Sequence, residues 1–434
     1  MYRLKIFLQS GIVRLRNDRY YRNALLFVSA SLITSGLNYL YYPIMGRMLG
    51  LESYGELQVV TSFLLQLTTV FTGLNLISVN IVANHDEEQS KTLIVALQKT
   101  VFWFVTIACI GVLLASPALE QFFHFGSAWP FILLTPALLV DAIAVFWTAY
   151  LQGKHDFKSL SIYSILTGAG KIVFSVVFIL MGMGVAGGIL GIVVGLWLSL
   201  LAVRFVTKHE LPPLLQTLSW PTKHEITLIK HHLGFIVEVI VSLIAMSILL
   251  SIDVMLVKHF FSPEFAGQYS GVSTVSRIIF YASAPLVAVM LPAITIRNLQ
   301  TNKQAFHRTL AISVTVCLAG LLLFSVFAYP IMRILLGNDF ARASSWLPLL
   351  SIIALLVTLT NVIVNYLLAV RSHLALWISL VSLVASGILL VLHHATIYQI
   401  VFSTSAGLVL GQTIFWATYI AKRTKIAPSA GLDG

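Results

Sequence analysis

The amino-acid sequence predicts an all-α polytopic membrane protein with twelve transmembrane helices, arranged as two parallel six-helix halves around a central cavity. Of the 434 residues, 58% are hydrophobic and 10% are charged, whereas about a quarter of the residues of a soluble domain are charged. The apolar residues form continuous runs of about 20, the length of a helix that crosses a hydrocarbon core of about 30 Å. Strands of a membrane barrel would alternate over about ten residues, so these runs indicate helices.

Twelve apolar runs define the expected spans. They lie at about 23–45, 54–83, 93–116, 128–152, 159–181, 184–206, 231–258, 266–296, 306–329, 345–370, 373–393 and 396–420. The longest polar connection follows the sixth run and divides the spans into two sets of six. The sequence therefore predicts an N-terminal bundle over 23–206, a linker over 207–230 and a C-terminal bundle over 231–420.

The lysines and arginines assign a side of the membrane to each connection. With a cytoplasmic N-terminus, 21 of the 27 lie in segments on the cytoplasmic side, four lie outside and two lie within spans. Cytoplasmic segments of membrane proteins carry this excess of Lys and Arg, so both termini are expected to be cytoplasmic. The N-terminal arm, residues 1–22, has one apolar helical face among basic residues, which is typical of a helix lying on anionic lipid. The expected tail comprises residues 421–434.

A short charged corner follows the first span and recurs after the seventh. Within the stretch MGRMLGLESYGELQVV, residues 45–60, the segment GRMLGLESYGEL at 46–57 aligns with VKHFFSPEFAGQY, residues 257–269, when one residue is inserted. The aligned pairs are Arg47 with Lys258, Glu52 with Glu264, and Gly55 with Gly267. Because both copies have the same predicted orientation, they indicate a parallel repeat of six plus six spans. Repeats of this kind place substrate sites near the midplane, between the halves.

The first helix pair, with NYLYYPIMGRMLGLESYGELQVV at residues 38–60, resembles the polysaccharide flippases of O-antigen and capsule assembly, which belong to the multidrug/oligosaccharidyl-lipid/polysaccharide (MOP) exporter superfamily. The resemblance implies a transporter, not an enzyme, in the inner membrane of a bacterium. It implies flipping of an undecaprenyl-pyrophosphate-linked oligosaccharide from the cytoplasmic to the outer leaflet by alternating access, coupled to H+ or Na+. Other proteins of polysaccharide assembly are candidate partners.

Charged residues inside spans are costly, and they usually mark a pathway or a binding site. Lys171 and Asp141 fall at similar depths on the fifth and fourth spans. They are expected to form a structural ion pair, or a functional pair in which Lys171 contacts substrate phosphate and Asp141 binds the coupling ion. A third alternative is that the two side chains never meet.

Arg277 lies deep in the eighth span, and Tyr281 follows one turn later on the same face. The planar fork of arginine suits phosphate oxygens, so both residues are expected to bind substrate. The alternative for Arg277 is a structural pair with Glu238 or Asp253. These two acidic residues of the seventh span are candidates for ion coupling, unless each simply faces water near its own end of the helix.

Polar residues recur every three or four positions along the first two spans. Asn38 and Gln66 belong to these stripes, which line either a wet cavity or a neighbouring helix. We expect both to contact substrate. Arg47 and Lys258 at the repeated corners are expected to receive or release the headgroup, although a purely structural hinge would explain them equally well.

Several other functions are disfavoured by the sequence. GMGVAG at 182–187 matches a dinucleotide-binding pattern, but it joins two apolar runs and not a strand to a helix. Cys109 and Cys317 fall within spans, so no cofactor or metal is expected, and the basic residues follow topology, so no nucleic acid is expected. One alternative to a flippase is a cation-coupled multidrug antiporter, which requires a cavity without cationic side chains. The other is an envelope glycan polymerase or ligase, which requires a large external loop.

Overall fold

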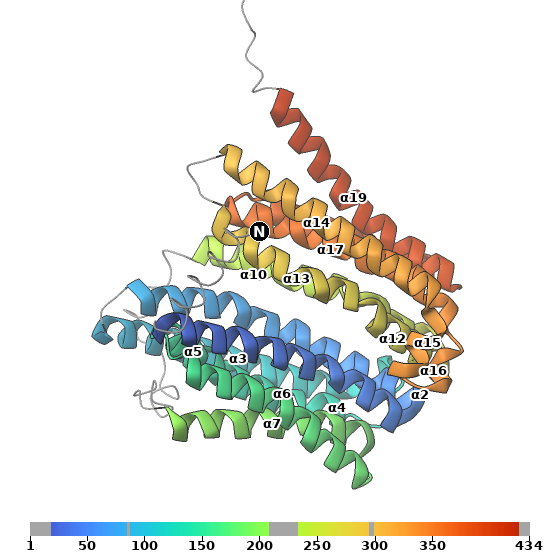
Figure 1. Cartoon of the computed structure of the whole chain (residues 1–434). Helices are drawn as coiled ribbons and strands as arrows, with labels where there is room; N and C mark the ends of the chain where they lie inside the picture. The colour runs from blue at the N-terminus through green and yellow to red at the C-terminus, as the bar shows by residue number, and fades with distance from the viewer. Residues whose placement is uncertain (1–18, 85–86, 208–232, 295–298, 425–434) are drawn as a thin grey trace, which may run out of the picture. The chain divides into compact units, whose positions relative to one another are not determined.

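The computed structural model describes residues 19–84, 87–207, 233–294 and 299–424 (Figure 1). Within these ranges the chain is helical and has no strand, which confirms the all-α class. The helices are α2 (Arg19–Asn84), α3 (Glu87–Phe122), α4 (Trp129–Ile132), α5 (Leu134–Gly153), α6 (Phe157–Leu180), α7 (Gly184–Val206), α10 (Leu233–Leu249), α11 (Ile252–Phe260), α12 (Pro263–Ser276), α13 (Ile278–Ala293), α14 (Leu299–Val326), α15 (Ala328–Leu335), α16 (Asn338–Ala341), the 3-10 turn η1 (Ser344–Trp346), α17 (Leu347–Ala369), α18 (Leu374–Leu392) and α19 (Ile397–Thr424). The predicted arm, linker and tail lie largely outside the described residues.

Each of the twelve predicted spans coincides with a helix or a helix pair. Among the described residues, ten helices are long and apolar enough to cross a membrane, and α10 with α11 forms an eleventh span that is bent by 48°. The first two spans are merged in α2, which Gly50 interrupts with φ 74° and ψ −178°. The structure therefore agrees with twelve spans, two of which share one long helix.

The helices divide into two compact units. Unit 1 takes the described residues up to Leu49 and those from Leu67 to Leu233; unit 2 takes Gly50–Gln66 and the described residues from Gly234 onward. The chain thus leaves unit 1 at the Gly50 break and returns within the second span. The predicted bundles, 23–206 and 231–420, stay a prediction. The two compact units differ from them in that residues 50–66 belong to unit 2.

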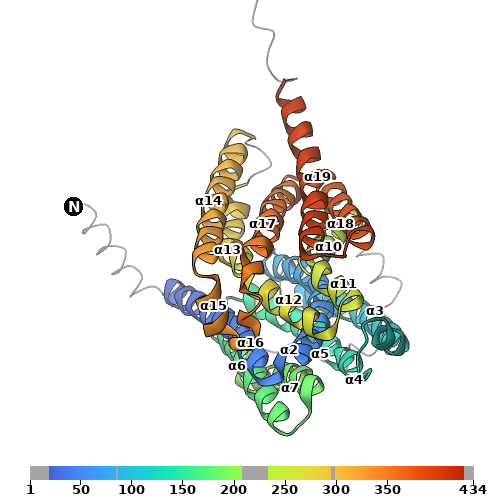
Figure 2. The ribbon, with the colours of Figure 1, turned by 90° about the vertical axis from the view of Figure 1, so that its right-hand side faces the viewer.

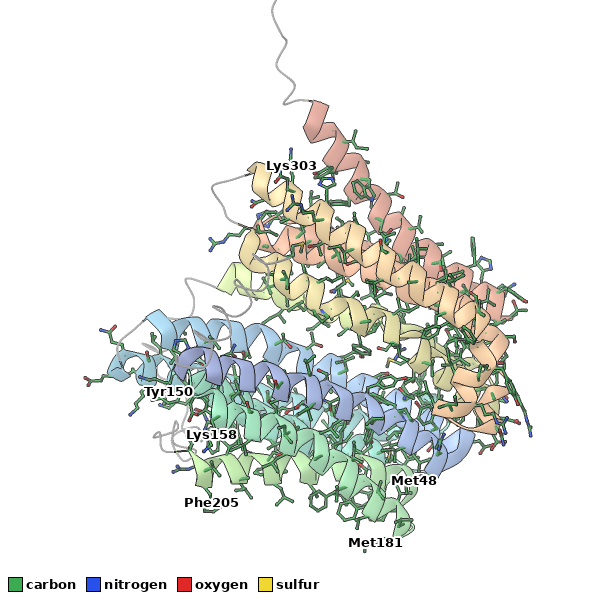
Figure 3. All side chains as sticks on the ribbon, in the orientation of Figure 1. Met48, Tyr150, Lys158, Met181, Phe205 and Lys303 are labelled. Atoms are coloured by element: carbon green, nitrogen blue, oxygen red, sulfur yellow. The ribbon has the colours of Figure 1, made fainter. Side chains whose placement is uncertain are left out.

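In unit 1, α6 and α7 are antiparallel neighbours that approach closely along a row of glycines (Figure 1). A Cβ at Gly191 would meet the backbone of Ser175, and a Cβ at Gly195 would lie 2.6 Å from the backbone nitrogen of Lys171. Figure 3 shows Lys158 and Phe205 at one end of this pair and Met181 at the other. These small residues allow the two helix backbones to approach closely.

Helix α17 forms the centre of unit 2 and packs against α12, α13, α14, α18 and α19. Figure 2 shows α17, α18 and α19 side by side in this unit. Helices α18 and α19 repeat the close packing of unit 1, since a Cβ at Gly407 or Gly411 would meet Ser386 or Ser382. The connection between the predicted ninth and tenth spans, residues 330–344, contains α16 and most of α15.

Candidate functional site

Lys171 lies within α6, where its ammonium group contacts two aromatic rings. The Nζ atom is 4.4 Å from the centre of the Tyr41 ring and 5.6 Å from that of Tyr42. Tyr41 is fully buried, and its hydroxyl donates a hydrogen bond of 3.1 Å to the carbonyl of Gly188. A cation over an aromatic face is attracted by the electron density of the ring. The two tyrosines therefore stabilise the ammonium group without neutralising it.

Lys171 and Asp141 do not form an ion pair. No carboxylate lies within 4.0 Å of the Lys171 ammonium among the described residues, and Asp141 likewise has neither an ion pair nor a hydrogen-bonding side-chain partner there. The third alternative of the sequence analysis is the one observed. The reason is helix rotation, since α6 turns Lys171 toward Tyr41 of α2, whereas Asp141 on α5 faces a cavity.

This cavity in unit 1 has a volume of about 380 Å³ and is bounded by α2, α5 and α6. The polar side chains that line it are Thr68, Thr72, Asn75, Asp141, Thr148 and Tyr163. The amide of Asn75 donates to the hydroxyl of Thr148 at 3.3 Å and to the carbonyl of Val145 at 3.4 Å. Of the residues that line this cavity, sequence reasoning singled out Asp141 alone.

In unit 2, Arg277 and Asp253 form an ion pair with an N–O distance of 3.4 Å. Asp253 is 3% exposed and also accepts hydrogen bonds from the hydroxyl groups of Tyr269, at 2.8 Å, and Ser273, at 3.4 Å. The alternative in which Arg277 pairs with an acidic residue of the seventh span is therefore the one observed. A carboxylate with two hydroxyl donors and a guanidinium partner is the arrangement that a buried charge requires.

Two helix breaks meet at this pair. Asp253 lies in the first turn of α11, just after the bend that separates α10 from α11. Arg277 is the single residue between α12 and α13. A small cavity beside the pair is lined by Asp253, Ser273 and Arg277. Both charged groups thus sit where the regular backbone is interrupted, a position common for binding groups in transporters.

Glu238, the other acidic residue of the seventh span, contacts His373 and not Arg277, the partner considered in the sequence analysis. Its carboxylate lies 2.9 Å from Nδ1 of His373, which precedes α18. The His373 side chain is 86% exposed and the Glu238 side chain 11% exposed. The pair links the start of the seventh span to that of the eleventh, so Glu238 and Asp253 occupy separate polar sites at opposite ends of their span.

The two repeated corners meet in unit 2. A Cβ at Gly55 would lie 3.2 Å from Gly267, and a Cβ at Gly267 would meet the carbonyl of Leu51. Lys258 is 2% exposed and forms an ion pair of 3.7 Å with Glu56. The aligned glycines of the two sequence copies are therefore in direct contact, which explains why both copies need a glycine at this position.

The remaining predicted residues are distributed between the units. Arg47 and Asn38 are exposed side chains of α2 in unit 1, and Tyr281 is 47% exposed on α13. Gln66 donates hydrogen bonds to Ser251, at 3.1 Å, and to the sulfur of Met255. Gln66 thus supports the break between α10 and α11. Its position in unit 2 could not be predicted from the polar stripe alone.

No group of three or more metal-ligating His, Cys, Asp or Glu side chains occurs in the described ranges. Cys109 and Cys317 are both buried free thiols. The charged groups described above are therefore the candidate functional groups of the described chain. They are Lys171 and Asp141 in unit 1, and the Arg277–Asp253, Lys258–Glu56 and His373–Glu238 pairs in unit 2.

The fold is that of known membrane transporters. It matches a structure described as "Inward-facing conformation of a multidrug resistance MATE family transporter of the MOP superfamily", with a TM-score of 0.70, 16% identity and coverage of 93% of this chain and 99% of that one. It also matches "Lipid II flippase MurJ, inward closed conformation", with a TM-score of 0.67, 14% identity and coverage of 92% and 87%. No curated protein sequence matches the chain.

The sequence itself matches a family model described as "Polysaccharide biosynthesis protein" over residues 20–298. This match spans more than half of the chain, from the first helix through the Arg277 region and into the end of the eighth span. The family match shows to which family the sequence belongs, and the structural matches, at 16% and 14% identity, show the fold. The chain belongs to the polysaccharide biosynthesis protein family.

Proposed function

We propose that this protein flips an undecaprenyl-pyrophosphate-linked oligosaccharide from the cytoplasmic to the outer leaflet of a bacterial inner membrane by alternating access. The observation that carries the proposal is the ammonium group of Lys171, which lies within a membrane span and has no carboxylate partner in the described part of the chain. An uncompensated intramembrane cation is costly. A pyrophosphate headgroup supplies the counter-charge that the protein itself does not.

Lys171 has the chemistry that such a headgroup requires. Its ammonium group carries three donors on a flexible stem, and the rings of Tyr41 and Tyr42 hold it without consuming its charge. Arg277 is a second candidate for the pyrophosphate, once Asp253 releases it. Arg47, Lys258, Asn38, Gln66 and Tyr281 remain proposed contacts along the path of the headgroup.

Coupling to a proton or Na+ is proposed at the acidic residues of unit 2. Protonation of Asp253, or binding of a cation to it, would weaken the ion pair with Arg277 and free a guanidinium group for phosphate. The same change at Glu238 would release His373. Flipping rates in vesicles under an imposed proton gradient, compared with an imposed Na+ gradient, identify the ion.

Lys171→Ala is expected to reduce flipping at least tenfold, because the charge that attracts pyrophosphate is lost. The measurement is translocation of lipid-linked oligosaccharide in proteoliposomes, with complementation of a flippase-deficient strain as the cellular readout. Lys158→Ala is the matched control, since this exposed lysine lies on the same helix but at its end. Wild-type flipping by Lys171→Ala would refute the role of the cation.

A multidrug antiporter is the second candidate function, and the Asp141 cavity is the observation that favours it. A carboxylate without an internal counter-charge could bind an organic cation. Lys171 in the same unit opposes such a ligand. Efflux of a cationic dye that depends on Asp141 and not on Lys171 would favour the antiporter over the flippase.

A further inference from the structure

The unit 1 cavity is lined by one carboxylate, that of Asp141, and by neutral polar groups, with no cationic side chain in its lining. The amide protons of Asn75 are directed to Thr148 and Val145, and the hydroxyl of Thr148 donates to the carbonyl of Ala144 at 2.8 Å. These donors are thus engaged within the protein. The groups left for a ligand are the two oxygens of Asp141 and the side-chain oxygen of Asn75, which accept hydrogen bonds, and the hydroxyls of Thr72 and Tyr163, which can donate or accept.

The acceptor groups of the cavity, above all the Asp141 carboxylate, restrict which ligands can bind there. It must supply hydrogen-bond donors and must not be an anion, because the Asp141 carboxylate has no counter-charge among the described residues. A pyrophosphate supplies only acceptors and negative charge. Sugar rings supply several hydroxyl donors, and amino sugars add an ammonium group that complements the carboxylate.

The size and the walls of the cavity fit the same ligand. A volume of about 380 Å³ is far larger than a bare cation needs, and it falls in the range of roughly 300–1,000 Å³ that is usual for small-molecule sites. The ring of Tyr163 forms an aromatic wall beside the polar groups of α2 and α5. Aromatic side chains that combine an apolar face with nearby polar groups suit the mixed surface of a sugar ring.

We propose that this cavity binds one or two uncharged or amino-bearing sugar residues of the transported oligosaccharide, with Asp141 as the residue that rejects acidic sugars. The inference rests on the proposed flippase function and deepens it. Lys171 and Asp141 then recognise different parts of one substrate, which explains why the two charges do not neutralise each other. Asp141 is a specificity residue in this proposal and not the site of the coupling ion.

Protection of a cysteine in the cavity tests the proposal. Thr72 lines the cavity and its side chain is exposed, so Thr72→Cys gives an accessible reporter. The native cysteines are buried, and the unmodified chain serves as the labelling blank. The probes are methyl glucoside, methyl glucosaminide and methyl glucuronide, at equal osmolarity, on purified protein in lipid nanodiscs labelled with a maleimide.

Methyl glucoside and methyl glucosaminide are expected to slow labelling of the Thr72→Cys variant at least twofold, and methyl glucuronide to leave the rate unchanged. Adding Asp141→Asn to the reporter should remove the difference between methyl glucuronide and the other two glycosides, because the repelling charge is lost while the size of the side chain is kept. Met181→Cys is the matched control. Met181 is 69% exposed at the end of α6, away from the cavity, so no glycoside should change its labelling.

Three results would overturn the sugar site. They are no protection by any glycoside, equal protection by methyl glucuronide, and a labelling rate that responds only to Na+ or to pH. If protection fails while flipping still depends on Lys171, this inference falls and the proposed function stands. If the reporter shows the expected protection but the protein does not flip lipid-linked oligosaccharide, the flippase proposal falls and a sugar site remains.

Discussion

Individual charges in this membrane protein fall into two groups that differ in how they are compensated. Asp253 with Arg277, and Lys258 with Glu56, are buried and paired within unit 2. Lys171 in unit 1 has only aromatic contacts. Burying a charge is tolerated when a partner and hydrogen bonds compensate it. The charges of unit 2 are therefore compensated within the protein, whereas the Lys171 charge has no carboxylate partner among the described residues.

The Lys258–Glu56 pair is expected to behave as a coupled unit. Lys258→Met or Glu56→Gln alone leaves a charge in a largely buried site, and each should destabilise the protein by about 3–5 kcal/mol. The double variant should lose clearly less stability than the sum of the two single losses, because it leaves no unpaired charge in the buried site. Thermal unfolding of the four proteins in detergent measures the coupling. Strictly additive losses would mean that the two side chains do not depend on each other.

At this scale the sequence could predict which residues carry charge inside the membrane, but not how they pair. Asp141 and Lys171 were identified because charges are rare in apolar runs. Their lack of contact depends on the rotation of α5 and α6, which depends in turn on packing against α2 and α7. Tyr41 and Tyr269 were not predicted as partners, since nothing in a tyrosine within a span indicates that it supports a cation or a carboxylate.

Close packing between helices depends on small residues at a few crossing points. In unit 1 the contact of α6 with α7 leaves no space for a Cβ at Gly191, because the backbone of Ser175 is directly opposite. The four-residue spacing of Gly187, Gly191 and Gly195 predicted this contact from the sequence. The contact of Gly55 with Gly267 could be predicted only in part, as an alignment of repeats and not as a contact.

Gly191→Ala is expected to lower stability by about 1–3 kcal/mol, because overpacking forces the two backbones apart. Gly111→Ala on α3 is the matched control. Nothing lies within 4 Å of its added Cβ, so the better helix propensity of alanine should leave stability unchanged or raise it by up to about 1 kcal/mol. Thermal unfolding of both purified variants checks the pair. Equal effects would show that the helix contact is looser than described.

Across the whole molecule, sidedness and the division into units are the properties that matter for transport. The number of spans followed directly from apolar runs, and the division into units did not. Residues 50–66 belong to unit 2 although their chain neighbours on both sides belong to unit 1. Hydropathy cannot reveal this exchange, because it depends on which surface a span contacts and not on how apolar the span is.

Sidedness is expected to follow the Lys and Arg distribution. Met181→Cys should react with an impermeant thiol reagent in intact cells, whereas Lys158→Cys should react only after permeabilisation. The two positions lie at opposite ends of α6, and both side chains are exposed. Labelling of inside-out vesicles should reverse the pattern. Reaction at Lys158→Cys in intact cells would invert the predicted orientation.

The exchange of residues 50–66 also has a consequence for biogenesis. Glu56 emerges from the ribosome about 200 residues before Lys258, its partner in the finished protein. At a synthesis rate of about 5–20 residues per second, the second span is made roughly 10–40 seconds before this partner. The contact of Gly55 with Gly267 likewise forms only after the eighth span has been made. Assembly of this fold is therefore completed late, whatever the order in which its helices are inserted.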